Sequence, residues 1–377
     1  MSSAVWITGP TASGKSVLAR AAATELAAAG EPVFVLELDE IRQVITPSPS
    51  DTDTERDVVY RALVYMASAL TAAHASVIVD AIAHRRAWRD LARRKISRFA
   101  EVQLICPLEV LREREARRTS GDAPHGIYAR AGLLGSVIQA VDAPYEPALR
   151  PELTVDTRQE PREGAVRKIV ELVRKLAGPT ARRQDTRAPA WAIWVTGLPG
   201  SGKTTLSRKV AEALAARSTN VRVLEFAEFR RSLLDDEAES DATREIVHRA
   251  LAYTAKLLAE AGVPVIVDAT APRRAWRRLA RQLITHFAEV QLVCPDDVCG
   301  ERERAARWRL GSHPWPPAVP RPVPAPDMVI GYEASLAPEL ALHTDHDFSV
   351  NVDAFLRLAE RLQRAAIGAG YTPRPIA

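Results

Sequence analysis

The chain has 377 residues, of which 47% are hydrophobic and 26% are charged, and its formal net charge is +4 at pH 7. This composition is typical of a globular protein and excludes a disordered or fibrous chain. Because single hydrophobic cores stop growing at about 250–300 residues, the length favours two domains.

The composition also narrows the range of partners. No apolar run reaches the ~18 residues of a membrane-spanning helix, and the N-terminus lacks the basic and apolar pattern of a signal peptide. We therefore expect a cytoplasmic protein without a membrane partner. The 44 arginines outnumber the 7 lysines and are interleaved with 47 acidic residues, so nucleic acid is an unlikely partner.

Short β-branched runs alternate with longer helical patterns along the first half of the chain. Strands are predicted at 5–8, 32–38, 77–80 and 102–106, and helices at about 15–29 and 54–74, with an Arg-rich helix before the last strand. Such alternation is typical of a mostly parallel sheet with helices on both faces. The predicted fold class is α/β.

The sequence repeats itself at an offset of 188 residues. Trp6-Ile-Thr-Gly matches Trp194-Val-Thr-Gly, and Val77-Ile-Val-Asp80 matches Val265-Ile-Val-Asp268. Solenoid repeats run only ~20–50 residues, so this period indicates two duplicated domains. We place them at 1–177 and 191–377, joined by a polar, Pro-flanked linker over 178–190.

Each copy carries the motif GxxxxGK[ST] between an apolar strand and a helix, so both are predicted to be P-loop NTPase-type domains. Backbone N–H groups of the loop surround phosphate oxygens, the lysine reaches the β- and γ-phosphates, and the hydroxyl binds Mg²⁺. The motif therefore predicts ATP and Mg²⁺ as cofactors. The residues that bind them are Gly9, Ser13, Gly14, Lys15 and Ser16 in the first copy and Gly197, Gly200, Ser201, Gly202, Lys203 and Thr204 in the second.

Asp80 and Asp268 end the third strand of their copies, at the edge of the sheet where ligands bind. A carboxylate there fits a catalytic role beside the P-loop, holding Mg²⁺ or ordering a water. The alternative is an N-cap of the following helix. Arg114, Arg117, Arg302 and Arg304 could fold over the nucleotide as a lid, or form a solvated helix face.

Further motifs of the first copy resemble those of adenylyl-sulfate kinases, P-loop enzymes that phosphorylate the ribose 3′-hydroxyl of adenosine 5′-phosphosulfate (APS). The resemblance covers nearly all of 4–157 and, more loosely, 192–345. The matching segments are Leu36-Glu-Leu-Asp39-Glu-Ile-Arg42, Glu55-Arg56-Asp-Val-Val-Tyr-Arg61, Gly126-Ile-Tyr-Ala-Arg-Ala131, Asp142-Ala-Pro-Tyr-Glu-Pro147 and Pro151-Glu-Leu153.

The resemblance implies roles for residues on the acceptor side. Asp39 would act with Lys15 in catalysis as the carboxylate near the acceptor hydroxyl, while Arg42, Arg56 and Arg61 would bind the anionic substrate, a task that suits guanidinium forks. The less favoured alternative for the segment containing Asp39 and Arg42 is an N-capped surface helix with an i,i+3 ion pair.

Departures from the family pattern leave the acceptor open. Glu37 replaces the first Asp of the family's motif, and neither 46–51 nor 138–142 carries an aromatic residue to stack on adenine. Another nucleotide-like or small anionic metabolite is therefore an alternative substrate. A nucleotide-binding regulatory protein with little turnover is an alternative of another class. Trp88 and Trp276 could stack on a base but are better explained as core.

The second copy keeps the ATP motif and changes the acceptor side. Ala227 replaces Asp39, while Arg230 stands where the first copy has Arg42. A Pro-rich stretch over 312–326 replaces the segment around Gly126. We expect this copy to bind nucleotide without efficient transfer, unless Glu225 or Glu228 substitutes. The resemblance also implies pairing, as an intrachain pseudo-dimer or a homodimer.

Overall fold

The computed structural model describes residues 2–50, 52–117, 128, 144–178, 189–234, 240–309, 331–344 and 347–368, without the side chains of 296, 303, 304 and 306–309. These residues form two compact units. One comprises Met1–Arg187 with Glu237–Ile246, and the other comprises Ala188–Asp236 with Val247–Ala377. Within the described part, no helix is both long and apolar enough to cross a membrane. The boundaries predicted at 177 and 191 stay a prediction.

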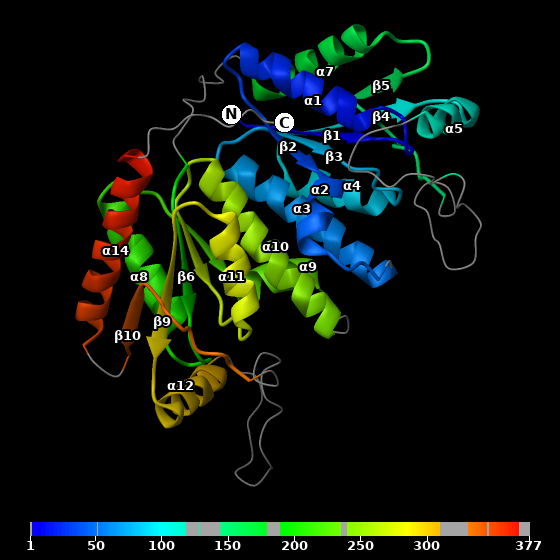
Figure 1. Cartoon of the computed structure of the whole chain (residues 1–377). Coiled ribbons are helices and arrows are strands. Elements are labelled where there is room, and N and C mark those ends of the chain that lie inside the picture. Colours follow the sequence, from blue (N-terminus) through cyan, green and yellow to red (C-terminus); the bar gives the residue numbers. More distant parts are fainter. Residues whose placement is uncertain are drawn as a thin grey trace. The chain divides into compact units, whose positions relative to one another are not determined.

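The first half of the chain folds into a five-stranded parallel sheet in the order β2-β3-β1-β4-β5. Helices α1 and α7 pack on one face and α3 and α4 on the other (Figure 1), which confirms the predicted α/β class. The elements are β1 (Ala4–Thr8), α1 (Lys15–Ala28), β2 (Phe34–Glu37), α2 (Leu38–Ile45), α3 (Asp53–Ala72), β3 (Val77–Asp80), α4 (Arg86–Lys95), β4 (Phe99–Ile105), α5 (Leu108–Ala116), β5 (Leu153–Asp156) and α7 (Arg162–Ala177).

Two predicted strands differ from the structure in ways that have a physical reason, while the first differs only by beginning at Ala4. The fourth begins at Phe99, three residues early, because Glu101 is buried inside it and breaks the apolar pattern. The second ends at Glu37, since α2 starts at the next residue. Leu38, Ile41 and Ile45 are the buried residues of α2, at helical spacing. The helix considered for the segment around Asp39 is therefore present.

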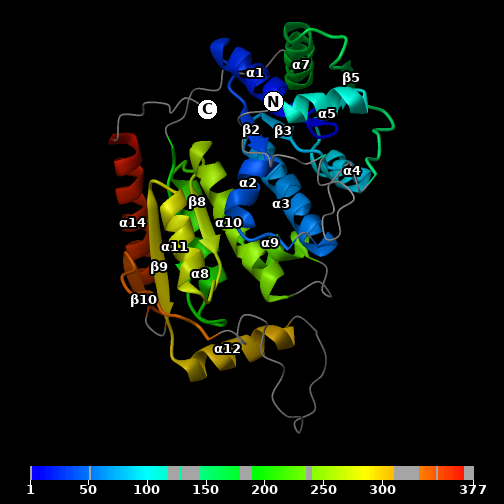
Figure 2. The same cartoon turned by 45° about the vertical axis from the view of Figure 1, so that its right-hand side comes forward.

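The second half repeats this architecture with a five-stranded parallel sheet in the order β10-β9-β6-β8-β7. Helices α8 and α14 pack together against one face and α11 packs on β9 (Figure 2). The elements are β6 (Ala192–Thr196), α8 (Lys203–Ala216), β7 (Arg222–Glu225), α9 (Phe226–Leu233), α10 (Asp241–Glu260), β8 (Val265–Asp268), α11 (Arg274–Leu283), β9 (Phe287–Val293), α12 (Asp296–Arg309), β10 (Leu340–His343) and α14 (Phe348–Gly368).

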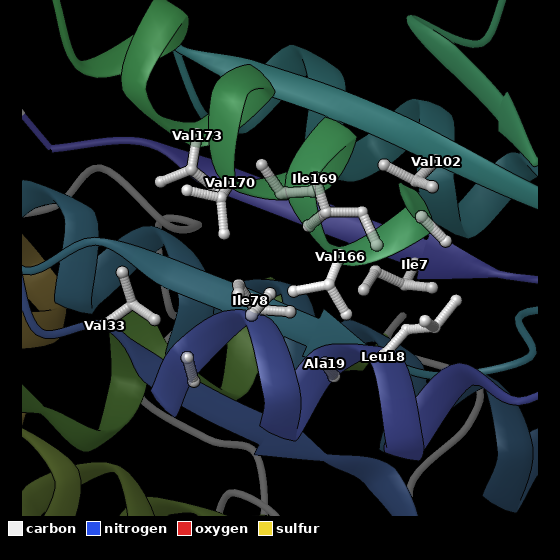
Figure 3. Packing of buried hydrophobic residues seen from close by; sticks show 14 of the residues in the cluster. Ile7, Leu18, Ala19, Val33, Ile78, Val102, Val166, Ile169, Val170 and Val173 are labelled. Atoms are coloured by element: carbon white, nitrogen blue, oxygen red, sulfur yellow. The ribbon is translucent and has the colours of Figure 1, made fainter. Parts of the chain in front are cut away.

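An apolar layer holds the helix that follows each P-loop on its sheet. In the first copy, Leu18 and Ala19 of α1 and Ile169 and Val173 of α7 belong to one buried cluster over the strands (Figure 3). In the second copy, Phe355 of α14 belongs to the equivalent cluster. Burying each of the larger side chains stabilises the fold by about 1.5–3 kcal/mol. The position of the P-loop is therefore fixed by the core beneath it.

A buried ion pair ties the opposite face together in each copy. The Arg89 Nε lies 2.6 Å from Glu101 Oε1, with the two side chains 0% and 5% exposed. The same guanidinium donates hydrogen bonds to the carbonyls of Ala83 and Glu146. Arg277 and Glu289 repeat this pair in the second copy. Identical strand sequences containing a glutamate, Phe99-Ala-Glu-Val-Gln-Leu and Phe287-Ala-Glu-Val-Gln-Leu, were a sequence signal for it.

The last two segments that match the family, which contain Glu146 and Glu152, take part in this packing. Glu146 Oε2 accepts a hydrogen bond from the backbone N–H of Arg86 at 2.7 Å, at the start of α4. Glu152 binds the guanidinium of Arg93 through both oxygens, at 2.6 and 2.9 Å, and accepts from the N–H of Glu101. Both glutamates therefore have structural partners.

We expect Arg89→Met to destabilise the chain by about 3–5 kcal/mol, because it removes the buried counter-ion of Glu101 and leaves the longer, half-exposed contact with Arg93 at 3.7 Å. The double variant Arg89→Met/Glu101→Leu should recover most of this loss, since no buried charge remains. Urea unfolding of the full chain measures both. Arg174→Met, which removes an exposed pair with Glu31, is the control and should cost less than about 1 kcal/mol. Equal losses for the two arginines would contradict the assignment.

Candidate active site

The P-loops have the backbone shape that presents their N–H groups to an anion. Gly9 has φ +153°, and a Cβ there would lie 2.8 Å from the carbonyl oxygen of Leu104. Gly14 has φ +98° and immediately precedes α1. Gly197 and Gly202 repeat these conformations. Only glycine fits such positions without strain, so both loops can bring the backbone close to phosphate.

The P-loop lysines lie across their loops. Lys15 Nζ donates to the carbonyl of Pro10 at 3.1 Å. Lys203 Nζ donates to the carbonyls of Gly197 and Leu198 at 3.0 and 2.9 Å. The ammonium of each copy thus lies beside the loop that carries the anion-binding N–H groups. This is the placement from which it can reach a bound phosphate.

The third-strand aspartates contact the P-loop hydroxyls. Thr204 Oγ1 donates to Asp268 Oδ2 at 2.5 Å, and Ser16 hydrogen-bonds Asp80 in the first copy. Burial raises the pKa of Asp80 to about 6, although Lys15 and Ser16 act in the opposite direction. Burial likewise raises the pKa of Asp268. The alternative of a helix N-cap is wrong, because α4 begins only at Arg86.

These residues fit Mg²⁺. The ion prefers hard oxygen ligands and typically takes one or two carboxylates together with phosphate oxygens and water. A hydroxyl and a carboxylate in direct contact supply the protein's share, and a nearby cation would relieve the cost of a buried negative charge. Among the described residues, no group of three or more His, Cys, Asp and Glu side chains could hold a metal. The phosphates of a nucleotide would have to complete the coordination.

Glu37, which departs from the family pattern, has a structural partner. Arg20 of α1 binds both of its oxygens at 2.6 Å. Arg208 binds Glu225 in the same way at 2.7 and 2.8 Å. The longer side chain at this position reaches the P-loop helix, so Glu37 and Glu225 fasten the second strand of each sheet to it.

Asp39 is exposed in the first turn of α2, directly after the strand that pairs with β3. Glu37 and Asp80 are register partners in these two strands, and Asp39 follows two residues after Glu37. Its charge acts in the direction that raises the pKa of Asp80. The catalytic role of Asp39 stays a prediction.

The predicted substrate-binding arginines each face a carboxylate. Arg42 lies 3.4 Å from Glu55, and the buried Arg56 lies 3.4 Å from Asp53. Arg61 makes a shorter contact of 2.6 Å with Asp57. Whether these arginines bind a substrate anion stays a prediction.

Tyr60 is a site residue that the sequence analysis missed. Its buried ring stacks on Trp88 at 4.0 Å, and its hydroxyl accepts the N–H of Ala83 at 3.0 Å. Burial raises its pKa, and the charges of Arg42 and Asp39 act on it. Ala83, three residues after Asp80, has φ +42°, a strained conformation of the kind that clusters at functional sites. The place of Tyr60 in the matching segment Glu55–Arg61, one helical turn after Arg56, was the signal that could have found it.

The predicted lid residues are partly described. Tyr128, of the Gly126-Ile-Tyr segment, donates from its hydroxyl to the P-loop carbonyl of Thr11 at 2.9 Å; the rest of that segment lies outside the described residues. Arg114 binds the carbonyl and hydroxyl oxygens of Thr157 at 2.7 and 2.9 Å. Arg302 donates to the carbonyl of Thr344 at 3.0 Å. These two arginines anchor α5 and α12 to the turn after the last strand.

Trp88 and Trp276 belong to the core, as favoured from the sequence. They are 3% and 1% exposed. The indole N–H of Trp88 donates to Asp57 at 2.8 Å. Neither ring is therefore available to stack on a base.

Comparison with known proteins identifies the family. The profile of adenylylsulphate kinase matches residues 1–156 and 189–309, which lie in both copies. A probable adenylyl-sulfate kinase of Archaeoglobus fulgidus is 36% identical over 164 residues, 43% of this chain and 100% of the relative. The adenylyl-sulfate kinase of Synechococcus sp. (strain JA-3-3Ab) is 35% identical over 158 residues, 41% of this chain and 85% of its own.

Among solved structures, a whole APS kinase chain matches about half of this chain. The Mycobacterium tuberculosis APS kinase CysC, in complex with AMPPNP and APS, is 27% identical, and the match covers 46% of this chain and 98% of that one. The TM-score is 0.35, so this likeness adds no argument of its own.

We expect Gly200→Ala to disrupt the second P-loop at a cost of about 1–3 kcal/mol. Gly200 has φ +79°, and a Cβ there would lie 2.2 Å from the carbonyl oxygen of Cys299. The first copy carries Ala12 at the equivalent position, with φ +64°. Ala12→Gly is therefore the matched control and should change stability by less than about 1 kcal/mol. Thermal unfolding measures both, and equal effects would contradict the predicted contact.

Asp80 should make the stability of the ligand-free chain depend on pH. Its folded-state pKa of about 6 lies above the ordinary value of 3.8, so the unfolded chain loses the proton first. The carboxyl therefore lowers stability as pH rises between about 4 and 6, by at most about 3 kcal/mol. Asp80→Asn should be more stable than the unsubstituted chain at pH 7.5 and equally stable at pH 3.5. Urea unfolding at the two pH values tests this, and a pH-independent difference would contradict it.

Proposed function

Since the chain belongs to the adenylylsulphate kinase family, we propose that its first copy transfers the γ-phosphate of ATP to the 3′-hydroxyl of adenosine 5′-phosphosulfate. The product would be 3′-phosphoadenylyl sulfate, as in sulfate assimilation. The observation that supports this proposal is the register of β2 and β3, in which Glu37 pairs with Asp80. Asp39 follows two residues after Glu37, in the first turn of α2, so an acceptor-side carboxylate would lie next to the donor site.

The P-loop residues act on the donor nucleotide. The N–H groups around Gly9 and Gly14 bind phosphate oxygens, and Lys15 leaves the carbonyl of Pro10 to reach the transferred phosphoryl group. Ser16 and Asp80 would hold Mg²⁺, which when bound neutralises charge on the phosphates. Because Ser16 already contacts Asp80, the chain needs little rearrangement to offer these two oxygens together.

The acceptor side positions and deprotonates the hydroxyl. Asp39 is exposed in the first turn of α2 and accepts the proton of the attacking hydroxyl. Arg42 and Arg56 bind the phosphosulfate of the substrate by giving up their long contacts with Glu55 and Asp53. Tyr60 of α3 stacks on Trp88 and accepts the N–H of Ala83, three residues after Asp80. The helix that carries Arg56 is thereby held beside the strand that carries Asp80.

The missing adenine-stacking residues leave one competing acceptor. Residues 46–50 bring no aromatic side chain to the end of α2, and 138–142 lie outside the described residues. A smaller anionic metabolite would use the same arginines without needing a stacking surface. The cytoplasmic location and the pairing of the copies, within a chain or between chains, stay predictions from the sequence.

An ATP-turnover assay with Mg²⁺, with and without APS, tests the proposed reaction. Rapid ADP formation should require APS in the unsubstituted chain. Asp39→Asn should lower kcat by about 10²–10⁴-fold, because it removes the proton acceptor while leaving the size of the side chain unchanged. Glu40→Gln, on the next residue of the same helix, is the control for a loss of negative charge. ATP binding without any APS dependence would reject this acceptor, and a panel of phosphorylated metabolites would then identify the substrate.

A further inference from the structure

The second copy keeps every part of the donor site that the structure describes in the first. Gly197 and Gly202 have the positive φ values of Gly9 and Gly14. Lys203 lies across its loop through two hydrogen bonds, and Thr204 contacts Asp268. The phosphate-binding N–H groups, the cation and the metal-binding oxygens are thus all present. A site for a nucleoside triphosphate with Mg²⁺ is complete.

At one position of the predicted acceptor side, the second copy lacks the carboxylate of the first. Ala227 stands at the position of Asp39. Glu225 cannot replace it, because Arg208 holds both of its oxygens at 2.7 and 2.8 Å, as Arg20 holds Glu37 in the first copy. Glu228 corresponds to Glu40, which in the first copy accompanies Asp39 and does not take its place.

An aromatic stack occupies the adjoining position. His248 replaces Tyr60 and is fully buried. One face of its ring packs on Phe226 at 4.4 Å, and it stacks on Trp276 at 3.8 Å. Phe226 itself replaces Leu38 at the start of α9. The hydroxyl that reaches the loop after β3 in the first copy is therefore absent here, and ring-to-ring packing fills its place.

We infer that the second copy binds a nucleoside triphosphate with Mg²⁺ and holds it without transferring its phosphate. This copy is a nucleotide-sensing unit: it has an intact donor site and no group at position 227 to take the proton from an acceptor hydroxyl. This inference rests on the proposed function in one respect: it takes the first copy to be the one that transfers phosphate. Occupancy of the second site would report the nucleotide level, and the bound nucleotide would stay intact.

Nucleotide stoichiometry on the full chain tests the first half of the inference. Equilibrium dialysis with a non-hydrolysable ATP analogue and Mg²⁺ should give two molecules per unsubstituted chain. Lys15→Ala and Lys203→Ala should each give one, and the double variant none. Two molecules bound to Lys203→Ala, or none bound to Lys15→Ala, would overturn the second site.

Turnover tests the second half. In Lys15→Ala, ATP bound to the second copy should be recovered intact, and ADP formation should fall at least 100-fold further than in Lys203→Ala. The matched variant Asp39→Ala gives the first copy the residue of the second. It should still bind two nucleotides while its turnover falls by about 10²–10⁴-fold. Turnover retained in Lys15→Ala or Asp39→Ala would overturn the inference. Absence of APS-dependent turnover in the unsubstituted chain would instead reject the proposed acceptor, and the recovery of intact ATP would still decide the second site.

Discussion

A backbone can bind phosphate through its own N–H groups only where no side chain separates those groups from the ligand. Both P-loops meet this constraint with glycines at positive φ, packed so closely on the strand beside them that a Cβ at Gly9 or Gly197 would lie 2.8 Å from a carbonyl oxygen. The loops in turn depend on the apolar layers that hold α1 and α8 on their sheets. Every other group of the site is positioned relative to this arrangement.

Buried charge is the second constraint. Asp80 and Asp268 are almost fully enclosed, at a cost that their hydroxyl and lysine neighbours offset only in part, as their raised pKa values indicate. Glu101, on the other face of the sheet, is also buried, and burial raises its pKa too. The difference lies in the partners: Glu101 has the guanidinium of Arg89 at 2.6 Å, whereas the partner of Asp268 is the hydroxyl of Thr204. The first arrangement serves the fold, and the second leaves a carboxylate that a cation could bind.

Comparison of the two copies distinguishes the charges that stabilise the fold from those predicted to act on an acceptor. The structural pairs are kept in both copies: Arg20 with Glu37 and Arg208 with Glu225, Arg89 with Glu101 and Arg277 with Glu289. On the predicted acceptor side, Arg230 and Arg244 still stand for Arg42 and Arg56, whereas Ala227 replaces Asp39 and the buried His248 replaces Tyr60. A copy that binds nucleotide without transferring phosphate must keep its fold and its donor site, whereas the residues of its acceptor side can change. The pattern of retained and altered residues is what the proposed division of work requires.

The sequence by itself determined the α/β class, the duplication and both nucleotide motifs, because these depend on local periodicity and on short segments such as Gly9–Ser16 that fold as one piece. It also placed Trp88 in the core through helical spacing. Only the tertiary structure decided that Asp80 faces Ser16 and does not cap a helix, that Glu37 is held by Arg20, and that Tyr60 reaches the backbone of Ala83. Each of these contacts joins residues 17 to 64 positions apart along the chain. The packing of separate strands and helices brings them together, and no local pattern encodes it.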